Sequence, residues 1–120
     1  MVEKFVKSEF LKSVFQASSA GSIIYLKVSN ELYKIERTRE EIVLSLPGES
    51  EKPLIIIEMT RNLISPVINE IEPSKIKELF RNSYIKGDIK VKVAAPTAML
   101  VSSGVALILR ELGLTCDKNN

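Results

Sequence analysis

The sequence predicts one α+β domain with an about five-stranded, mainly antiparallel sheet and helices packed on one face of it. Its 120 residues, 45% of them hydrophobic, suffice for one buried core and leave little room for a second. Short β-branched runs separated by turn residues come early, whereas most helical patterns come later. This order favours strands joined as hairpins over alternating strand–helix units. The sequence therefore predicts a single domain over residues 1–120.

An N-terminal helix is predicted over residues 3–17, within an N-terminal helical region 1–17. Apolar residues recur there at helical spacing, with lysines and a serine towards the other side. Serines and a glycine at 18–22 break the pattern. At the other end, residues 115–120 are expected to form a flexible tail that includes Cys116.

A β-hairpin follows the first helix. Residues 22–28 and 32–37 are rich in apolar and β-branched side chains and flank a tight turn at 29–31. Residues 42–46 alternate in a way that predicts a third strand, and the turn that follows contains Pro47 and Gly48.

A fourth strand is predicted at 54–57, where the run is continuously apolar and suits a strand covered on both faces. Thr60 suits the N-cap of a helix over 61–70, and Pro66 predicts a kink or two short pieces there. Pro73 suits the first position of a helix over 73–82.

A fifth strand is predicted over 84–93, because apolar residues alternate there with charged ones. Its lysines, interrupted by Asp88, favour an edge or solvent-facing strand over a nucleic-acid surface, since Tyr84 is the only aromatic residue in this segment. A weak contact with a lipid headgroup is the remaining alternative for this lysine row. The last helix is expected to begin at Pro96 and Thr97 and to end at Gly113.

The least usual feature is an uncharged segment over residues 93–109. It is too short for a membrane span, which needs about 20 apolar residues, and no transmembrane segment is predicted. The segment is either a central core or interface helix, which base rates favour, or one wall of an apolar cavity. Small residues such as Ala98 and Ser102 suit close packing as well as a cavity.

The side chains needed for common catalysis are scarce. The sequence has no histidine and one cysteine, so it lacks the commonest general base and metal ligand, and no disulfide can form within the chain. No serine has the context of a nucleophile elbow, and no carboxylate set has calcium-loop spacing. We therefore expect a protein that is not an enzyme, with no cofactor and no metal. The near-balanced net charge of +2 argues against nucleic acid as a partner.

The single cysteine and the absence of an apolar leader segment favour a cytoplasmic location.

The second half of the chain resembles the sterol carrier protein 2 superfamily. The residues that carry the resemblance are the apolar strand 54–59, two short helices, the Gly87–Asp88 signature within 84–89, and a final apolar helix from Pro96. It covers roughly residues 20 to 114. The chain departs from the family where 89–93 extends a strand before the last helix. The resemblance implies a five-stranded sheet with helices on one face and a tunnel that holds sterols, fatty acids or acyl-CoA esters without turnover.

The leading hypothesis is a carrier domain for an apolar ligand, held between the sheet and the C-terminal helix. The candidate ligand-binding residues are Met59, Leu63, Val67, Leu79, Phe80, Met99, Leu100, Ser103 and Leu107. Either Ser102 or Ser103 would supply a polar contact. The alternative is an interaction module, with the apolar helix buried in a homodimer or against another protein.

Overall fold

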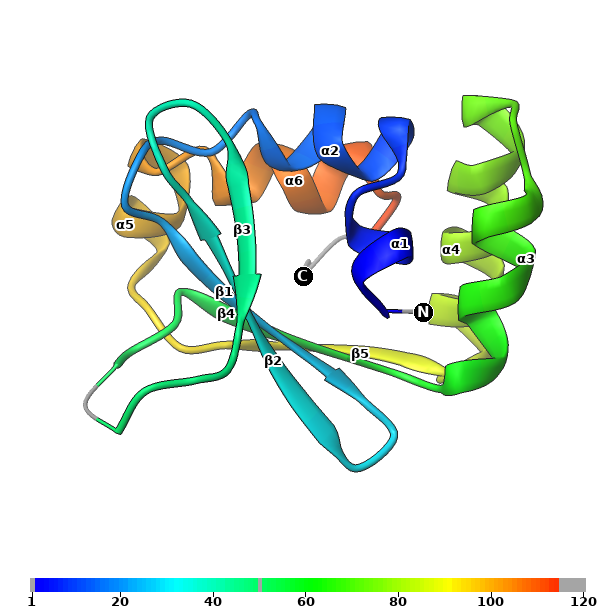
Figure 1. The fold of residues 1–120 in the computed structure, drawn as a ribbon, viewed down its shortest axis with the longest axis horizontal. Coiled ribbons are helices and arrows are strands. Elements are labelled where there is room, and N and C mark those ends of the chain that lie inside the picture. Colours follow the sequence, from blue (N-terminus) through cyan, green and yellow to red (C-terminus); the bar gives the residue numbers. More distant parts are fainter. Residues whose placement is uncertain (1, 50, 115–120) are drawn as a thin grey trace.

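A five-stranded sheet forms the base of the molecule (Figure 1). The computed structural model describes residues 2–49 and 51–114, so Cys116 and the expected tail lie outside the described residues. The strand order is β3-β2-β1-β4-β5, and only the β1–β4 pairing is parallel. The strands are β1 (Ile23–Val28), β2 (Glu31–Arg37), β3 (Ile42–Ser45), β4 (Ile55–Met59) and β5 (Ile89–Val93). The expected mainly antiparallel α+β fold is confirmed.

The helices gather on one side of β1, β4 and β5, as Figure 1 shows. Helix α1 packs against α3, α2 against α6, and α4 against α3 and β5. The helices are α1 (Val2–Val6), α2 (Glu9–Phe15), the 3-10 turn η1 (Arg61–Leu63), α3 (Ile64–Asn69), α4 (Pro73–Lys86), α5 (Thr97–Ser102) and α6 (Val105–Glu111). The break expected near Pro66 takes the form of η1 followed by α3.

Alternation along the strands gives the sheet two chemically different faces. On the covered face, which lies against the helices, Ile24, Leu26 and Ile57 are at most 2% exposed. On the open face, their neighbours Lys27 and Glu58 are only half-buried. Because the strand period is two, each strand directs apolar side chains to the covered face, while the open face mixes charged side chains with apolar ones such as Ile23 and Ile56.

The core lies between the covered face and the helices. Phe5 of α1 and Phe80 of α4 meet with ring centroids 6.2 Å apart. Both rings are at most 2% exposed, so the N-terminal helix is part of the core. The largest fully buried side chains come from both ends of the described chain: Phe5, Phe80, Leu11, Leu26, Ile55, Ile64, Ile89, Ile108, Leu112, Leu114, Val6 and Val28.

The N-terminal helix is two helices rather than the single one expected over 3–17. The backbone of Ser8 is extended, with φ −61° and ψ 150°, and separates α1 from α2. The Ser8 hydroxyl donates a hydrogen bond to the Phe5 carbonyl oxygen at 2.8 Å. This bond occupies a carbonyl group at the end of α1, while apolar residues on both pieces still reach the core.

The predicted strand at 84–93 is wrong in its first part. Helix α4 continues to Lys86, and β5 begins only at Ile89. Gly87 adopts φ +85° and ends the helix, and the Asp88 N–H donates to the Ser83 carbonyl at 2.8 Å. Ile85, expected on a strand, therefore lies on an exposed helix surface. The edge position of β5, with Lys90 and Lys92 exposed, agrees with the sequence.

The last helix is also two helices, because Gly104 interrupts it with φ +83°. A side chain at Gly104 would overlap the Ala17 carbonyl oxygen, so the backbones of residues 17 and 104 approach as only a glycine allows. Gly113 adopts φ +76° just after α6, which confirms it as the residue that ends the final helix.

On the open face, an ion-pair cluster ties the β3–β4 connection to the sheet. The Glu51 carboxylate pairs with Lys34 and accepts a hydrogen bond from the Gly48 N–H at 2.5 Å. These two partners lower the pKa of Glu51, and the bond to Glu51 raises the pKa of Lys34. Tyr25 lies beneath this connection and is 7% exposed, and its burial raises its pKa.

Candidate functional site

The residues that the sequence predicts as a ligand-binding set fall into two groups. Met59, Leu63, Val67, Phe80 and Leu100 are buried in the common core cluster, and Leu79 packs against it partly buried. Ser103 is half-buried, while Met99 and Leu107 are 50% and 47% exposed. The set therefore runs from the core between the helices and β4 to the outer surface of α5 and α6.

Helices α5 and α6 share the uncharged segment and differ in how firmly they are held. Helix α6 buries Val105, Ile108 and Leu109. Helix α5 buries only Leu100 and leaves Met99 and Val101 at 50% and 65% exposed. An uncharged helix with one buried side chain is weakly anchored, because most helical stability in proteins comes from packing of an apolar face.

The joint between α5 and α6 is fixed to the connection between α2 and β1. The Ser103 carbonyl accepts hydrogen bonds from the Ser19 N–H at 2.7 Å and from the Ser19 hydroxyl at 3.1 Å. The Ser103 hydroxyl donates to the Leu100 carbonyl at 3.2 Å, within its own helix. Gly104 presses against Ala17, as described above. Helix α5 thus has a firm attachment at its C-terminal end and a light one along its length.

A first hollow, of about 170 Å³, lies between the N-terminal helices and β3. It is lined by Val6, Lys7, Lys12, Glu41 and Ile42. None of the predicted ligand-binding residues lines it.

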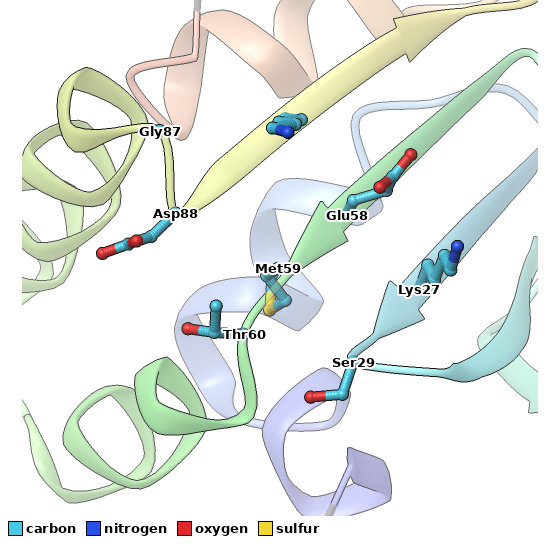
Figure 2. Close-up of a pocket in the computed structure, with 8 residues that line it drawn as sticks. Lys27, Ser29, Glu58, Met59, Thr60, Gly87 and Asp88 are labelled. Atoms are coloured by element: carbon cyan, nitrogen blue, oxygen red, sulfur yellow. The ribbon is translucent and has the colours of Figure 1, made fainter.

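A second hollow, of about 230 Å³, lies at the end of β1 and β4 and the start of β5 (Figure 2). Of the predicted ligand-binding residues, Met59 lines it. The other lining residues are mostly polar: Lys27, Ser29, Glu58, Thr60, Gly87, Asp88 and Lys90.

Strand register explains why these polar residues meet. Glu58 of β4 pairs with Lys27 of β1 and with Lys90 of β5, so the three form one row across the open face. The Glu58 carboxylate also pairs with Lys92 at 2.6 Å, and this bond, with the charges of the nearby lysines, lowers the pKa of Glu58.

Sequence reasoning identified parts of this hollow without recognising a site. It singled out Gly87–Asp88 and the lysine row of β5, and interpreted the lysines as those of a solvent-facing strand, with a weak lipid-headgroup contact as the alternative. Bringing Lys27 beside Glu58 requires the parallel β1–β4 pairing. No local pattern indicates which strands pair in parallel across such a connection.

Three further properties hold for residues 2–49 and 51–114. Within them, no three cysteine or carboxylate side chains come together in a way that could hold a metal ion. None of their helices has the length and apolarity to cross a membrane. Among their buried side-chain polar atoms, Nε of Arg37 lacks a hydrogen-bond partner.

The fold of this chain is similar to that of domains built like sterol carrier protein 2. A solved structure titled "UbiJ-SCP2 Ubiquinone synthesis protein" superposes with a TM-score of 0.51 at 11% sequence identity, over 91% of this chain and 86% of that chain. At this identity the likeness shows a shared fold. No protein-family model matches the sequence, and no curated protein matches it either.

Proposed function

We propose that this domain binds an apolar ligand, a fatty acid, an acyl-CoA or another lipid, between the covered face of the sheet and helices α5 and α6, without turning it over. The observation that carries the proposal is the uncharged α5–α6 segment, which lies half in the core and half exposed. The fold shared with the ubiquinone synthesis protein supports it and makes long-chain lipids the first ligands to test.

Helix α5 is the proposed movable cover over the ligand. Lifting it would expose mainly Leu100, at a cost of about 1.5–3 kcal/mol for one large aliphatic side chain. A lipid chain that buries about ten methylene groups gains about 8 kcal/mol, at about 0.8 kcal/mol each. The gain exceeds the cost of opening, so a ligand that separates α5 from the core is energetically reasonable.

The proposed lining remains the set that the sequence indicated. Met59, Leu63 and Val67 supply buried apolar surface near β4 and α3, and Leu79 and Phe80 supply it from α4. Met99 and Leu100 of α5 would turn towards the ligand when α5 lifts, and Leu107 of α6 would join the lining at the edge that α5 uncovers. Ser103 would offer its hydroxyl to the ligand's polar end. Most of the binding free energy would then come from apolar area removed from water, at about 25 cal/mol per Å².

Native mass spectrometry of freshly purified protein tests the proposal. The expected spectrum shows a monomer with an adduct of lipid mass, which disappears after delipidation and returns when oleic acid is added. A clean dimer that takes up no lipid contradicts the proposal and favours a protein-interaction role for the same helices.

A matched pair of variants at neighbouring serines locates the ligand. Ser103→Phe adds a ring at a half-buried position, and Ser102→Phe adds the same ring at an exposed one. We expect Ser103→Phe to lose lipid uptake while its circular dichroism spectrum stays native, and Ser102→Phe to keep uptake. Equal uptake by two folded variants would place the ligand elsewhere. Unfolding of Ser103→Phe would instead indicate dense packing at this position.

A further inference from the structure

The second hollow lies at the ends of β1 and β4 and the start of β5, where its Lys27, Glu58 and Lys90 belong to the open face, and it shares Met59 with the proposed lipid site. Continuing the strand register by two residues beyond the Lys27–Glu58–Lys90 row brings Ser29, Thr60 and Asp88 into a second row. The two rows line the hollow, with Met59 and Gly87 completing it. The end of one parallel strand pair and the start of an edge strand thereby place polar groups from three strands around one space.

The first row carries two ammonium groups that have no ion-pair partner. Lys92 neutralises the Glu58 carboxylate at 2.6 Å. Neither Lys27 nor Lys90 forms a salt bridge with any residue of the described chain. The lining itself carries two lysines, Lys27 and Lys90, and two carboxylates, Glu58 and Asp88. Because Lys92, which lies outside the lining, neutralises Glu58, a surplus of one positive charge remains only when Lys92 is counted with them (3 − 2 = +1).

The second row adds two hydroxyl donors. Ser29 is held at φ +55° in the β1–β2 turn, and its N–H donates to the Met59 carbonyl at 3.1 Å. Its hydroxyl and that of Thr60 make no hydrogen bond to the described part of the chain, and Figure 2 shows the two pointing to the same side. In the same view the Asp88 carboxylate points to the same side as these two hydroxyls and away from Lys27 and Glu58, and it would repel an anion on that side.

We propose that this hollow binds a phosphate group, carried either by a soluble phosphate ester or by a phospholipid headgroup. Two ammonium groups and two hydroxyls present donors from two sides, and phosphate oxygens are acceptors that form strong hydrogen bonds with charged donors. The surplus of positive charge disfavours a metal cation in the same space. At about 230 Å³, the hollow has room for the phosphate and for part of the group that it esterifies.

Titration followed by amide chemical shifts tests the site directly. With inorganic phosphate or glycerol 3-phosphate, we expect saturable shifts at Lys27, Ser29, Thr60 and Lys90. Lys27→Gln and Lys90→Gln should each weaken binding at least about tenfold, because each removes a charged hydrogen-bond donor. Lys75→Gln is the control, since it removes the same charge at an exposed position of α4, about 18 Å along the helix axis from Gly87.

Vesicles distinguish the two sources of phosphate. Binding to vesicles of phosphatidylcholine with phosphatidate, but not of phosphatidylcholine alone, together with the loss of this binding in Lys90→Gln, would assign a lipid headgroup. Shifts with glycerol 3-phosphate and no vesicle binding would assign a soluble ester. The proposal is overturned if none of these phosphates produces shifts at the hollow, or if Lys75→Gln weakens binding as much as the two hollow variants do.

Discussion

The two faces of the sheet are built from the same strands and have opposite chemistry. On β4, Ile55, Ile57 and Met59 face the helices and are at most 5% exposed, whereas Ile56 and Glu58 face the open side and are half-buried. The covered face contributes to an apolar core that ends at a weakly held helix, α5. The open face carries lysines and carboxylates in cross-strand rows.

This contrast in chemistry would keep the proposed lipid and phosphate sites apart. A lipid on the covered side would be held by area removed from water, which is insensitive to salt. A phosphate on the open side would be held by exposed charges, which salt screens. Substitutions on one face should therefore leave binding at the other face unchanged.

The largest difference is expected between adjacent isoleucines of β4. Ile57→Ala removes a side chain that is 2% exposed on the covered face and should lower the free energy of unfolding by about 2–5 kcal/mol. Ile56→Ala makes the same change on the open face, where the side chain is half-buried, and should lower it by about 1–2 kcal/mol. Urea denaturation measures both, and equal losses would contradict the assignment of the two faces.

The next difference is expected between two glycines with the same backbone conformation. Gly104 and Gly87 have φ +83° and +85°, so alanine at either is strained by about 1–2 kcal/mol. At Gly104 the added methyl group would also overlap the Ala17 carbonyl oxygen, whereas at Gly87 it meets nothing within 4 Å. Gly104→Ala should therefore destabilise the fold by about 1–3 kcal/mol more than Gly87→Ala does. Thermal unfolding monitored by circular dichroism measures the stability of both variants. Equal losses of stability in the two variants would mean that the joint between α5 and α6 is loosely packed.

The open-face ion pairs predict a dependence of stability on pH. The pKa values of Glu51 and Glu58 lie below their ordinary 4.5, because Lys34 and Lys92 bond to them. Their contribution is present above pH 4.5 and is lost as the pH falls through the lowered values. The pKa of Lys34 lies above its ordinary 10.5, so its contribution is present below that pH and is lost at more alkaline pH. Glu51→Gln with Glu58→Gln should flatten the acid side of a plot of unfolding free energy against pH, and an unchanged slope would count against these pairs.

The smallest effect on stability is expected at the exposed surface of α5. Met99→Gln changes a side chain that is 50% exposed and should alter the unfolding free energy by no more than about 0.5 kcal/mol. If Met99 turns towards a bound lipid, the same variant should still weaken uptake of a fluorescent fatty acid. Unchanged uptake would remove Met99 from the lining, while a large loss of stability would mean that α5 is packed more firmly than its exposure indicates.

Much of the fold could be predicted from sequence because its signals are local. Strand alternation, the hairpin turn at 29–31, Pro73 at the start of α4 and Gly113 after α6 each act within a few residues. The errors arose where a local pattern allowed two outcomes. Residues 84–86 alternate like a strand, yet they continue the hydrogen bonds of α4 until Gly87 caps it. At Gly104 a positive φ and the contact with Ala17 both exclude a side chain, and no local pattern indicates that contact, because Ala17 is 87 positions earlier in the chain (104 − 17).

The candidate sites were less predictable, because each depends on which distant segments meet. The uncharged segment indicated an apolar site, and helical periodicity alone could not show that α5 buries one residue while α6 buries three. The open-face hollow depends on the parallel pairing of β1 with β4, which places Lys27 beside Glu58 although they are 31 positions apart (58 − 27). Such pairings follow from the packing of the whole sheet rather than from any one strand.

Hydrogen exchange measured by mass spectrometry tests the central claim most directly. In the delipidated protein, amides of α5 should exchange faster than those of α6, because α5 is anchored by Leu100 and by its C-terminal joint. Addition of oleic acid should slow exchange in α5 and in the α3 and α4 segments that carry Val67 and Phe80, and leave β5 unchanged. Exchange in α5 as slow as in α6 before the addition, and unaltered by the lipid, would contradict a ligand held beneath that helix.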